Sequence, residues 1–166
     1  MKYIMENWRS YLTEDEQFSA MGLHLSNEQL NIDSITLEPR ITRQGRGGSY
    51  LGFYLVRLQG DQDKDLKLCE KAFREYVTDK SKPYYLYVVG IQCKESERLA
   101  TKNVIGATKI NKQKYNALLE KGIKLIDTGK LGIPTPEFVI LDKSVIKSFK
   151  QHKFNPGEDP CGVLKK

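Results

Sequence analysis

Residues 84–91 read Tyr-Tyr-Leu-Tyr-Val-Val-Gly-Ile, and this stretch decides the kind of fold that the chain adopts. It follows Pro83, is almost entirely apolar, and is short and rich in Tyr and Val, which favours a strand over a helix. A run of this kind is typical of a central β-strand that is buried on both faces. We therefore expect a sheet built around residues 84–91, with the rest of the chain supplying its neighbours.

Other segments predict the elements around this strand. The expected strands are those at residues 23–25, 49–58, 123–126 and 138–141. The expected helices are those at residues 65–79 and 112–121. Gly122 ends the second helix, residues 95–102 fit either a helix or a loop, and residues 145–154 begin a last element. Helices separate only some of the strands, so the pattern favours a mixed α+β fold over a doubly wound sheet.

The N-terminal segment differs from the rest, because no Gly or Pro interrupts residues 3–20. Apolar and aromatic side chains recur there at helical spacing, at Ile4, Trp8, Tyr11 and Leu12. We expect a helical arm over residues 1–20 and a main domain over residues 21–166. Residues 1–12 also resemble the N-terminal helices of some tailed-phage proteins, which implies a protein injected into or expressed in a bacterial host.

Composition narrows the classes of function. The 166 residues are enough for one domain with a core, and 39% hydrophobic with 29% charged residues fits a globular chain. No apolar run approaches the roughly 20 residues that span a bilayer, and the first residues do not read as a secretory signal. The net charge of +6 favours an anionic partner, although a solvated lysine-rich surface explains it equally well.

Cysteine and histidine are scarce. The three cysteines, Cys69, Cys93 and Cys161, are widely spaced and form no CxxC pair, so we expect neither a disulfide framework nor a zinc site, and we expect a cytoplasmic protein. Only two histidines occur, His24 and His152, which argues against a metal centre built on histidine clusters.

Three segments together suggest chemistry. The first is Gly22-Leu23-His24-Leu25-Ser26-Asn27, followed by Leu37-Glu38-Pro39-Arg40. The second is residues 47–55, ending in Gly52-Phe53-Tyr54-Leu55, with residues 72–76 on the helix behind it. The third is Pro136-Glu137-Phe138-Val139-Ile140-Leu141-Asp142, followed by an amphipathic tail.

In their order and spacing these segments resemble the three motifs of the ADP-ribosyltransferase superfamily, in the His-Tyr-Glu class of poly(ADP-ribose) polymerases and diphtheria-type toxins. The resemblance covers residues 23–154. It implies a mainly antiparallel split sheet with peripheral helices, and NAD as the substrate. Thr135 stands where arginine-directed toxins of this superfamily carry a second Glu or Gln, so modification of arginine is not expected.

The resemblance assigns catalytic roles to Glu137, His24 and Tyr54. Cleavage of the bond between nicotinamide and ribose leaves positive charge on the ribose, and a carboxylate beside it stabilises that charge, as carboxylates do in glycosidases. Glu137 would supply this carboxylate. His24 would donate a hydrogen bond to the adenosine ribose, and Tyr54 would stack on nicotinamide. Tyr50, four residues earlier, competes with Tyr54 for this role.

Further residues would bind the cofactor. Gly52 would allow NAD close to the backbone, and Arg40 would hold the pyrophosphate. Ser26 would either contact the nicotinamide side or cap the turn at Asn27, and the cap is the simpler role. Leu25 stands where the family carries Gly, whose amide meets the nicotinamide carboxamide, so activity itself stays open.

The leading hypothesis from the sequence is therefore NAD-dependent mono-ADP-ribosylation of a protein or nucleic acid, with release of nicotinamide and no need for a metal or a membrane. Two alternatives stay open: a basic, non-enzymatic protein that binds nucleic acid or inhibits a host complex, and an inactive scaffold with the transferase fold.

Overall fold

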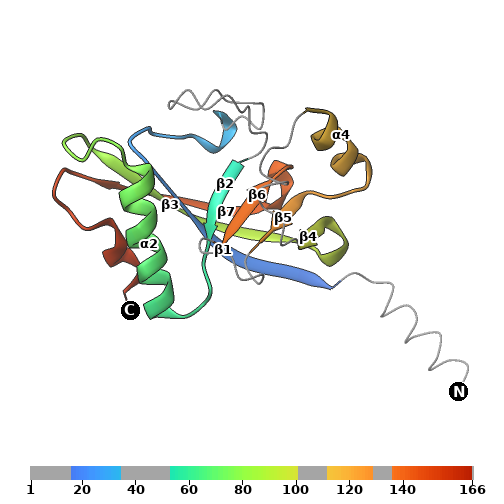
Figure 1. Cartoon of the computed structure of the whole chain (residues 1–166), viewed down its shortest axis with the longest axis horizontal. Coiled ribbons are helices and arrows are strands. Elements are labelled where there is room, and N and C mark those ends of the chain that lie inside the picture. Colours follow the sequence, from blue (N-terminus) through green and yellow to red (C-terminus); the bar gives the residue numbers. More distant parts are fainter. Residues whose placement is uncertain (1–15, 35–52, 101–111, 129–135, 166) are drawn as a thin grey trace, which may run out of the picture.

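A single seven-stranded sheet organises the chain (Figure 1). The computed structural model describes residues 16–34, 53–100, 112–128 and 136–165. The strands are β1 Gln17–Ser26, β2 Phe53–Arg57, β3 Tyr84–Lys94, β4 Arg98–Ala100, β5 Leu125–Asp127, β6 Glu137–Ile140 and β7 Ile146–Phe154. The helices are α2 Gln62–Tyr76 and α4 Lys112–Glu120, with short 3₁₀ turns η1 Ile32–Ser34, η2 Glu95–Glu97, η3 Lys143–Val145 and η4 Pro160–Leu164. The fold is thus α+β, as the sequence predicts.

The strand order is β4-β5-β6-β2-β1-β3-β7. Every neighbouring pair is antiparallel except β4 with β5, which is parallel. The longest pairing joins β1 to β3 from Gln17↔Lys94 to Ser26↔Tyr85. The strand expected at residues 84–91 is confirmed as the first part of β3, and its side chains are buried on both faces of the sheet.

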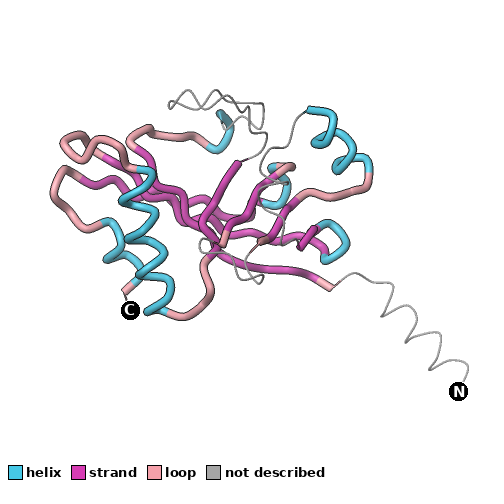
Figure 2. The backbone as a smooth tube through the Cα atoms, in the orientation of Figure 1, coloured by secondary structure: helices cyan, strands magenta, loops and turns pink. Residues whose placement is uncertain are grey.

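The two faces of the sheet have separate cores. One core contains Phe18, Phe53, Tyr87 and Phe138. On the other face, α2 packs its Cys69 and Ala72 against β1, β2 and β3, while α4 packs against β5 and β6. Figure 2 shows α2 and the C-terminal turn side by side on the sheet. This second face, covered by helices, is called the helix face below.

Gly22 allows β1 and β2 to approach closely. A Cβ atom at this position would lie 2.9 Å from the Cβ of Leu55 and 3.3 Å from the carbonyl oxygen of Val56. Both distances are shorter than ordinary carbon contacts, so a larger residue would push the strands apart. The glycine therefore fixes the one short stretch where β1 and β2 pair, Gly22↔Arg57 and Leu23↔Val56.

Three expectations from the sequence are wrong. Residues 98–100 form strand β4, where a helix or a loop was expected over residues 95–102, because they pair with β5, a contact that the local sequence does not show. Gln17–Ala20 belong to β1, so the helical arm does not extend to residue 20; residues 1–15 lie outside the described part. The expectation rested on the helical spacing of apolar residues 4–12, and this spacing does not indicate that a strand begins at Gln17. In addition, a disulfide joins Cys69 on α2 to Cys161 on η4, two residues 92 positions apart that only the folded chain brings together.

Candidate functional site

The three strands that carry the sequence motifs are neighbours in the sheet. β6, with Glu137, pairs with β2, and β2 pairs with β1, which carries His24. These segments are far apart in the chain, so their proximity is a product of the fold. A small cavity of about 60 Å³ lies where they meet. Its lining consists of Leu23, His24, Leu25, Tyr54, Leu55, Val56, Tyr76 and Glu137.

Tyr54 and Glu137 extend from the same face of the sheet. Tyr54 pairs with Val139, and Val56 pairs with Glu137, and directly paired residues of antiparallel strands share a face. Val139 and Val56 belong to the cores beneath α4 and α2, so Tyr54 and Glu137 lie on the helix face. The structure therefore brings together two of the three predicted catalytic side chains.

The main chain of Glu137 is fixed on both sides. Its N–H donates to the Thr128 hydroxyl at 2.8 Å, and its carbonyl accepts the Thr128 N–H at 3.0 Å. On the other side, the Arg57 N–H donates to the Pro136 carbonyl at 2.9 Å. Glu137 thus starts β6 at a rigid position, which suits a side chain that must meet a ligand in a set geometry.

The carboxyl group of Glu137 lies in an unusual environment. Its pKa is raised, mainly because partial burial disfavours the charged form and also because Glu75 on α2 adds negative charge; Lys71 opposes the shift. Within the described residues, no ion pair or hydrogen bond fixes this carboxylate. Perturbed carboxyl groups that line a cavity are candidates for functional residues.

Tyr76, in the last turn of α2, is a residue of the cavity to which sequence reasoning gave no role. Its pKa is raised to about 12, first by desolvation and then by Glu137 and Glu75. The side chain is nevertheless 45% exposed, so it forms the rim of the cavity rather than its floor. The sequence does place Tyr76 at the end of the helix that follows the second motif. Helical periodicity, however, does not show which end of this helix lies against the sheet, so the position of Tyr76 at the cavity could not be predicted.

The imidazole of His24 lies on the opposite face from Tyr54 and Glu137. It packs on Phe53 with ring centroids 4.8 Å apart and near Tyr87 at 6.1 Å, and both rings belong to the other core. Its Nδ1 atom lies 3.2 Å from the Tyr54 carbonyl oxygen. Successive side chains of a strand point to opposite faces, so His24 adjoins the cavity without placing its ring beside the Glu137 carboxylate.

β1 and β2 separate beside the cavity. Their recorded pairing covers two residue pairs, although β1 continues to Ser26. The Leu58 N–H donates to the Met21 carbonyl, so alternation directs the main-chain groups of Leu25 toward β2 as well. The Leu25 side chain is buried in the core beneath α2. The backbone of Leu25 therefore faces the region where the strands part.

The other predicted binding residues are placed as follows. The Ser26 hydroxyl accepts the Glu28 N–H at 2.9 Å, which is the capping role. Arg40, Tyr50 and Gly52 lie outside the described residues, so the choice between Tyr50 and Tyr54 stays a prediction.

The described part of the chain was also compared with the patterns of metal-binding groups and membrane-spanning helices. In these ranges no three His, Cys, Asp or Glu side chains gather as metal ligands would, and no helix is both long and apolar enough to cross a bilayer. No protein-family model matches the chain, and comparisons with curated proteins and with solved structures also find no match.

Proposed function

We propose that this protein is an NAD-dependent mono-ADP-ribosyltransferase that modifies a macromolecule. The observation that carries the proposal is the convergence of three distant motif segments on adjacent strands around one cavity, lined by Tyr54, Tyr76 and Glu137. The ADP-ribosyltransferase type of sheet is part of the same proposal.

In this proposal, Glu137 stabilises the transition state. The bond between the nicotinamide nitrogen and the ribose carbon breaks, and its electron pair leaves with nicotinamide. The positive charge that develops on the ribose faces the Glu137 carboxylate, in a site whose partial burial strengthens the attraction. A nucleophile of the acceptor then bonds to the same ribose carbon and loses its proton.

The two tyrosines would hold the nicotinamide ring. Tyr54 extends from the sheet and Tyr76 from α2, so the ring would lie between two aromatic walls. The cavity is small, and the half-exposed Tyr76 at its rim is the side chain that would turn to admit the ring. The Leu25 N–H, which strand alternation directs toward β2, would meet the carboxamide.

His24 would serve the other half of NAD. The cofactor is too large for a cavity of about 60 Å³, so the rest must extend beyond it. On the face where the imidazole packs, Tyr87 separates His24 from a groove of about 490 Å³ that includes Leu30, Ile32 and Phe149. We propose that NAD passes between the parted ends of β1 and β2 toward this groove. The different faces of His24 and Glu137 then match their different parts of the cofactor.

The test is release of nicotinamide from NAD, with a bacterial extract as the source of acceptor. Glu137→Gln keeps the shape of the side chain and should reduce release by roughly 10²–10³-fold, the usual effect of removing an electrostatic catalytic group. Glu120→Gln, at the exposed end of α4, is the matched loss of one carboxylate and should leave release unchanged. A wild-type protein that neither binds NAD nor releases nicotinamide contradicts the proposal.

A further inference from the structure

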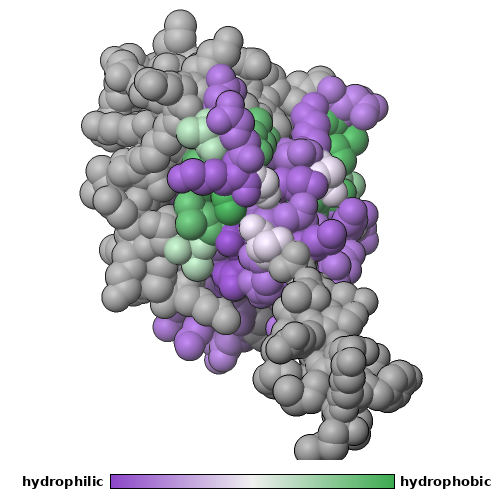
Figure 3. All heavy atoms as spheres, turned by 90° about the vertical axis from the view of Figure 1, so that its right-hand side faces the viewer, coloured by the Kyte–Doolittle hydropathy of each residue, from purple (hydrophilic) through white to green (hydrophobic). Residues whose placement is uncertain are grey.

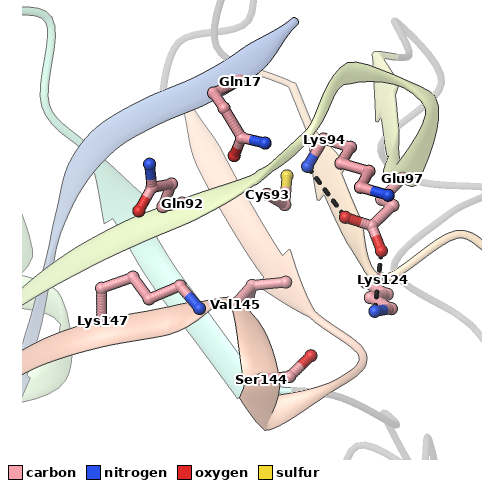
Figure 4. A pocket seen from close by; sticks show the side chains of 9 residues that line it. All are labelled: Gln17, Gln92, Cys93, Lys94, Glu97, Lys124, Ser144, Val145 and Lys147. Atoms are coloured by element: carbon pink, nitrogen blue, oxygen red, sulfur yellow. Dashed lines mark hydrogen bonds and ion pairs between the residues drawn. The ribbon is translucent and has the colours of Figure 1, made fainter. Parts of the chain in front are cut away.

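A second pocket lies at the opposite end of β3 from the candidate site (Figure 4). Its volume is about 510 Å³, within the range of small-molecule sites. Its lining includes Lys94, Lys124 and Lys147, and it is called the lysine pocket below. We propose that the lysine pocket binds the phosphate group of a small phosphorylated molecule. The proposal is independent of NAD chemistry, because none of the residues that line the cavity around Glu137 belongs to it.

The lysine pocket exists because the sheet is unfinished at this edge. β7 pairs with β3 only as far as Ile91↔Ile146, where the register shifts, whereas β3 continues to Lys94. The chain before Ile146 turns away as η3 and forms one wall, with Ser144 and Val145. The last residues of β3 form the floor.

The edge of β3 directs an amide into this gap. The Glu95 N–H donates to the Glu16 carbonyl at 2.8 Å, so the odd-numbered residues of β3 point their main-chain groups toward β1. By alternation, those of Gln92 and Lys94 point the other way. The Lys94 N–H donates to the Glu97 carboxylate at 2.8 Å. The Gln92 N–H faces the space that β7 leaves open.

The charge of the lining is positive. Three lysines, Lys94, Lys124 and Lys147, stand against one acid, Glu97, which gives a formal charge of +2 (3 − 1). Glu97 is already occupied, because it accepts from the Lys94 N–H and pairs with the Lys124 ammonium at 2.7 Å. These contacts lower the pKa of Glu97 and keep it ionised. Within the described residues, neither Lys94 nor Lys147 forms an ion pair, although the Lys94 charge also helps to lower the pKa of Glu97. Lys147, and in part Lys94, are therefore available to a ligand.

The neutral lining also suits an oxyanion. The amide groups of Gln17 and Gln92 and the hydroxyl of Ser144 are hydrogen-bond donors in the lining of the pocket, and in Figure 4 Gln92 lies on the same side of the pocket as Lys147. Much of the described surface on the right-hand side of Figure 1 is hydrophilic (Figure 3). A dianionic phosphate matches the charge of +2, and the remaining volume accommodates the molecule that carries it.

The test is a titration of ¹⁵N-labelled protein with inorganic phosphate and then with glucose 6-phosphate. We expect the Gln92 amide resonance to shift saturably with both, and glucose 6-phosphate to bind more tightly. The double variant Lys94→Gln with Lys147→Gln should bind at least about tenfold more weakly. Lys150→Gln, an exposed lysine on β7 outside the pocket, should change the affinity less than about twofold.

Three results would overturn the proposal: no saturable shift at Gln92, an equal loss of affinity in the Lys150 variant, or tighter binding of a short DNA strand than of glucose 6-phosphate. The first result means that no site exists, the second that binding is diffuse, and the third that the surface tracks a nucleic-acid backbone. Glu137→Gln should leave phosphate binding unchanged, and excess NAD should not displace phosphate. Failure of the proposed transferase activity is therefore distinguishable from failure of this site.

Discussion

Two carboxyl groups on adjacent strands have opposite surroundings. Asp127 ends β5 and pairs with Phe138, the residue next to Glu137, so the two acids lie on opposite faces of the same part of the sheet. Asp127 is only 1% exposed and lies 2.9 Å from Arg57 and 2.7 Å from Arg98. Glu137 has no ion pair within the described residues, and the negative charge of Glu75 raises its pKa. Arginines hold Asp127 in the fold, whereas Lys71 only partly offsets the raised pKa of Glu137, which is why we propose Glu137 and not Asp127 as the carboxylate that meets a ligand.

Aromatic rings complete the cluster around Asp127. The Arg98 guanidinium lies 4.3 Å from the Phe18 ring centroid, and that of Arg57 lies 5.2 Å from the Phe138 ring centroid. Such contacts hold the cations in place and add cation–π attraction. Asp127, Arg57 and Arg98 therefore form a charged cluster within the core, and we assign this cluster no catalytic role.

The largest effect on stability is expected from Asp127→Asn. Removing the charge leaves Arg57 buried without its counterion, which costs about 3–5 kcal/mol in comparable buried pairs. Urea denaturation measures this loss. Glu137→Gln is the matched change on the other face and should cost less than about 1 kcal/mol. Equal losses in the two variants would remove the distinction between the two acids.

Loss of the disulfide should change the pKa of Glu137 and leave the ion pairs of Asp127 in place. Cys161→Ser opens the link between α2 and η4 and should cost about 2–4 kcal/mol of stability. Because α2 carries Tyr76 and Glu75, the pKa of Glu137 should also change, as seen by NMR of the carboxyl carbons. A reducing agent should reproduce both effects in the wild type and change nothing in Cys161→Ser. An unchanged Glu137 pKa would show that α2 keeps its position without the link.

The pH dependence of stability should differ between wild type and Glu137→Gln. The pKa of Glu137 is raised in the folded state, so its contribution to stability is complete below the ordinary glutamate pKa and is lost as pH rises through the folded value. The variant has no such loss. Its stability relative to wild type should therefore increase as pH rises from acid to neutral. A flat difference over this range would contradict the raised pKa.

The smallest effect is expected from Glu75→Gln. Loss of this negative charge should lower the pKa of Glu137, and also that of Tyr76 below about 12, because Glu75 raises both. Burial, the larger cause, is unchanged, so both values should stay above those of free side chains. NMR titration of each group measures the shifts, and Glu70→Gln on the same helix is the control. A Glu137 pKa unaffected by Glu75 would mean that burial alone sets it.

The sequence predicted the elements better than the directions of their side chains. The apolar run at residues 84–91 and the strand that begins at Glu137 both form because β-branched and aromatic residues fill a buried sheet. The face of His24 depends on strand register, which a motif does not encode. The contact of Cys69 with Cys161 and the place of Tyr76 depend on how α2 packs, and only the folded chain fixes that packing.

In the proposed function, the cavity between β1, β2 and β6 receives the nicotinamide end of NAD. Titration of ¹⁵N-labelled protein with NAD tests it most directly, because the Leu25 and Tyr76 amides report on two sides of the cavity. We predict saturable shifts at Leu25, Tyr76 and Glu137, with smaller changes at Lys94 and Gln92 in the lysine pocket. Saturable shifts confined to the lysine pocket, or none at any NAD concentration, would contradict the claim.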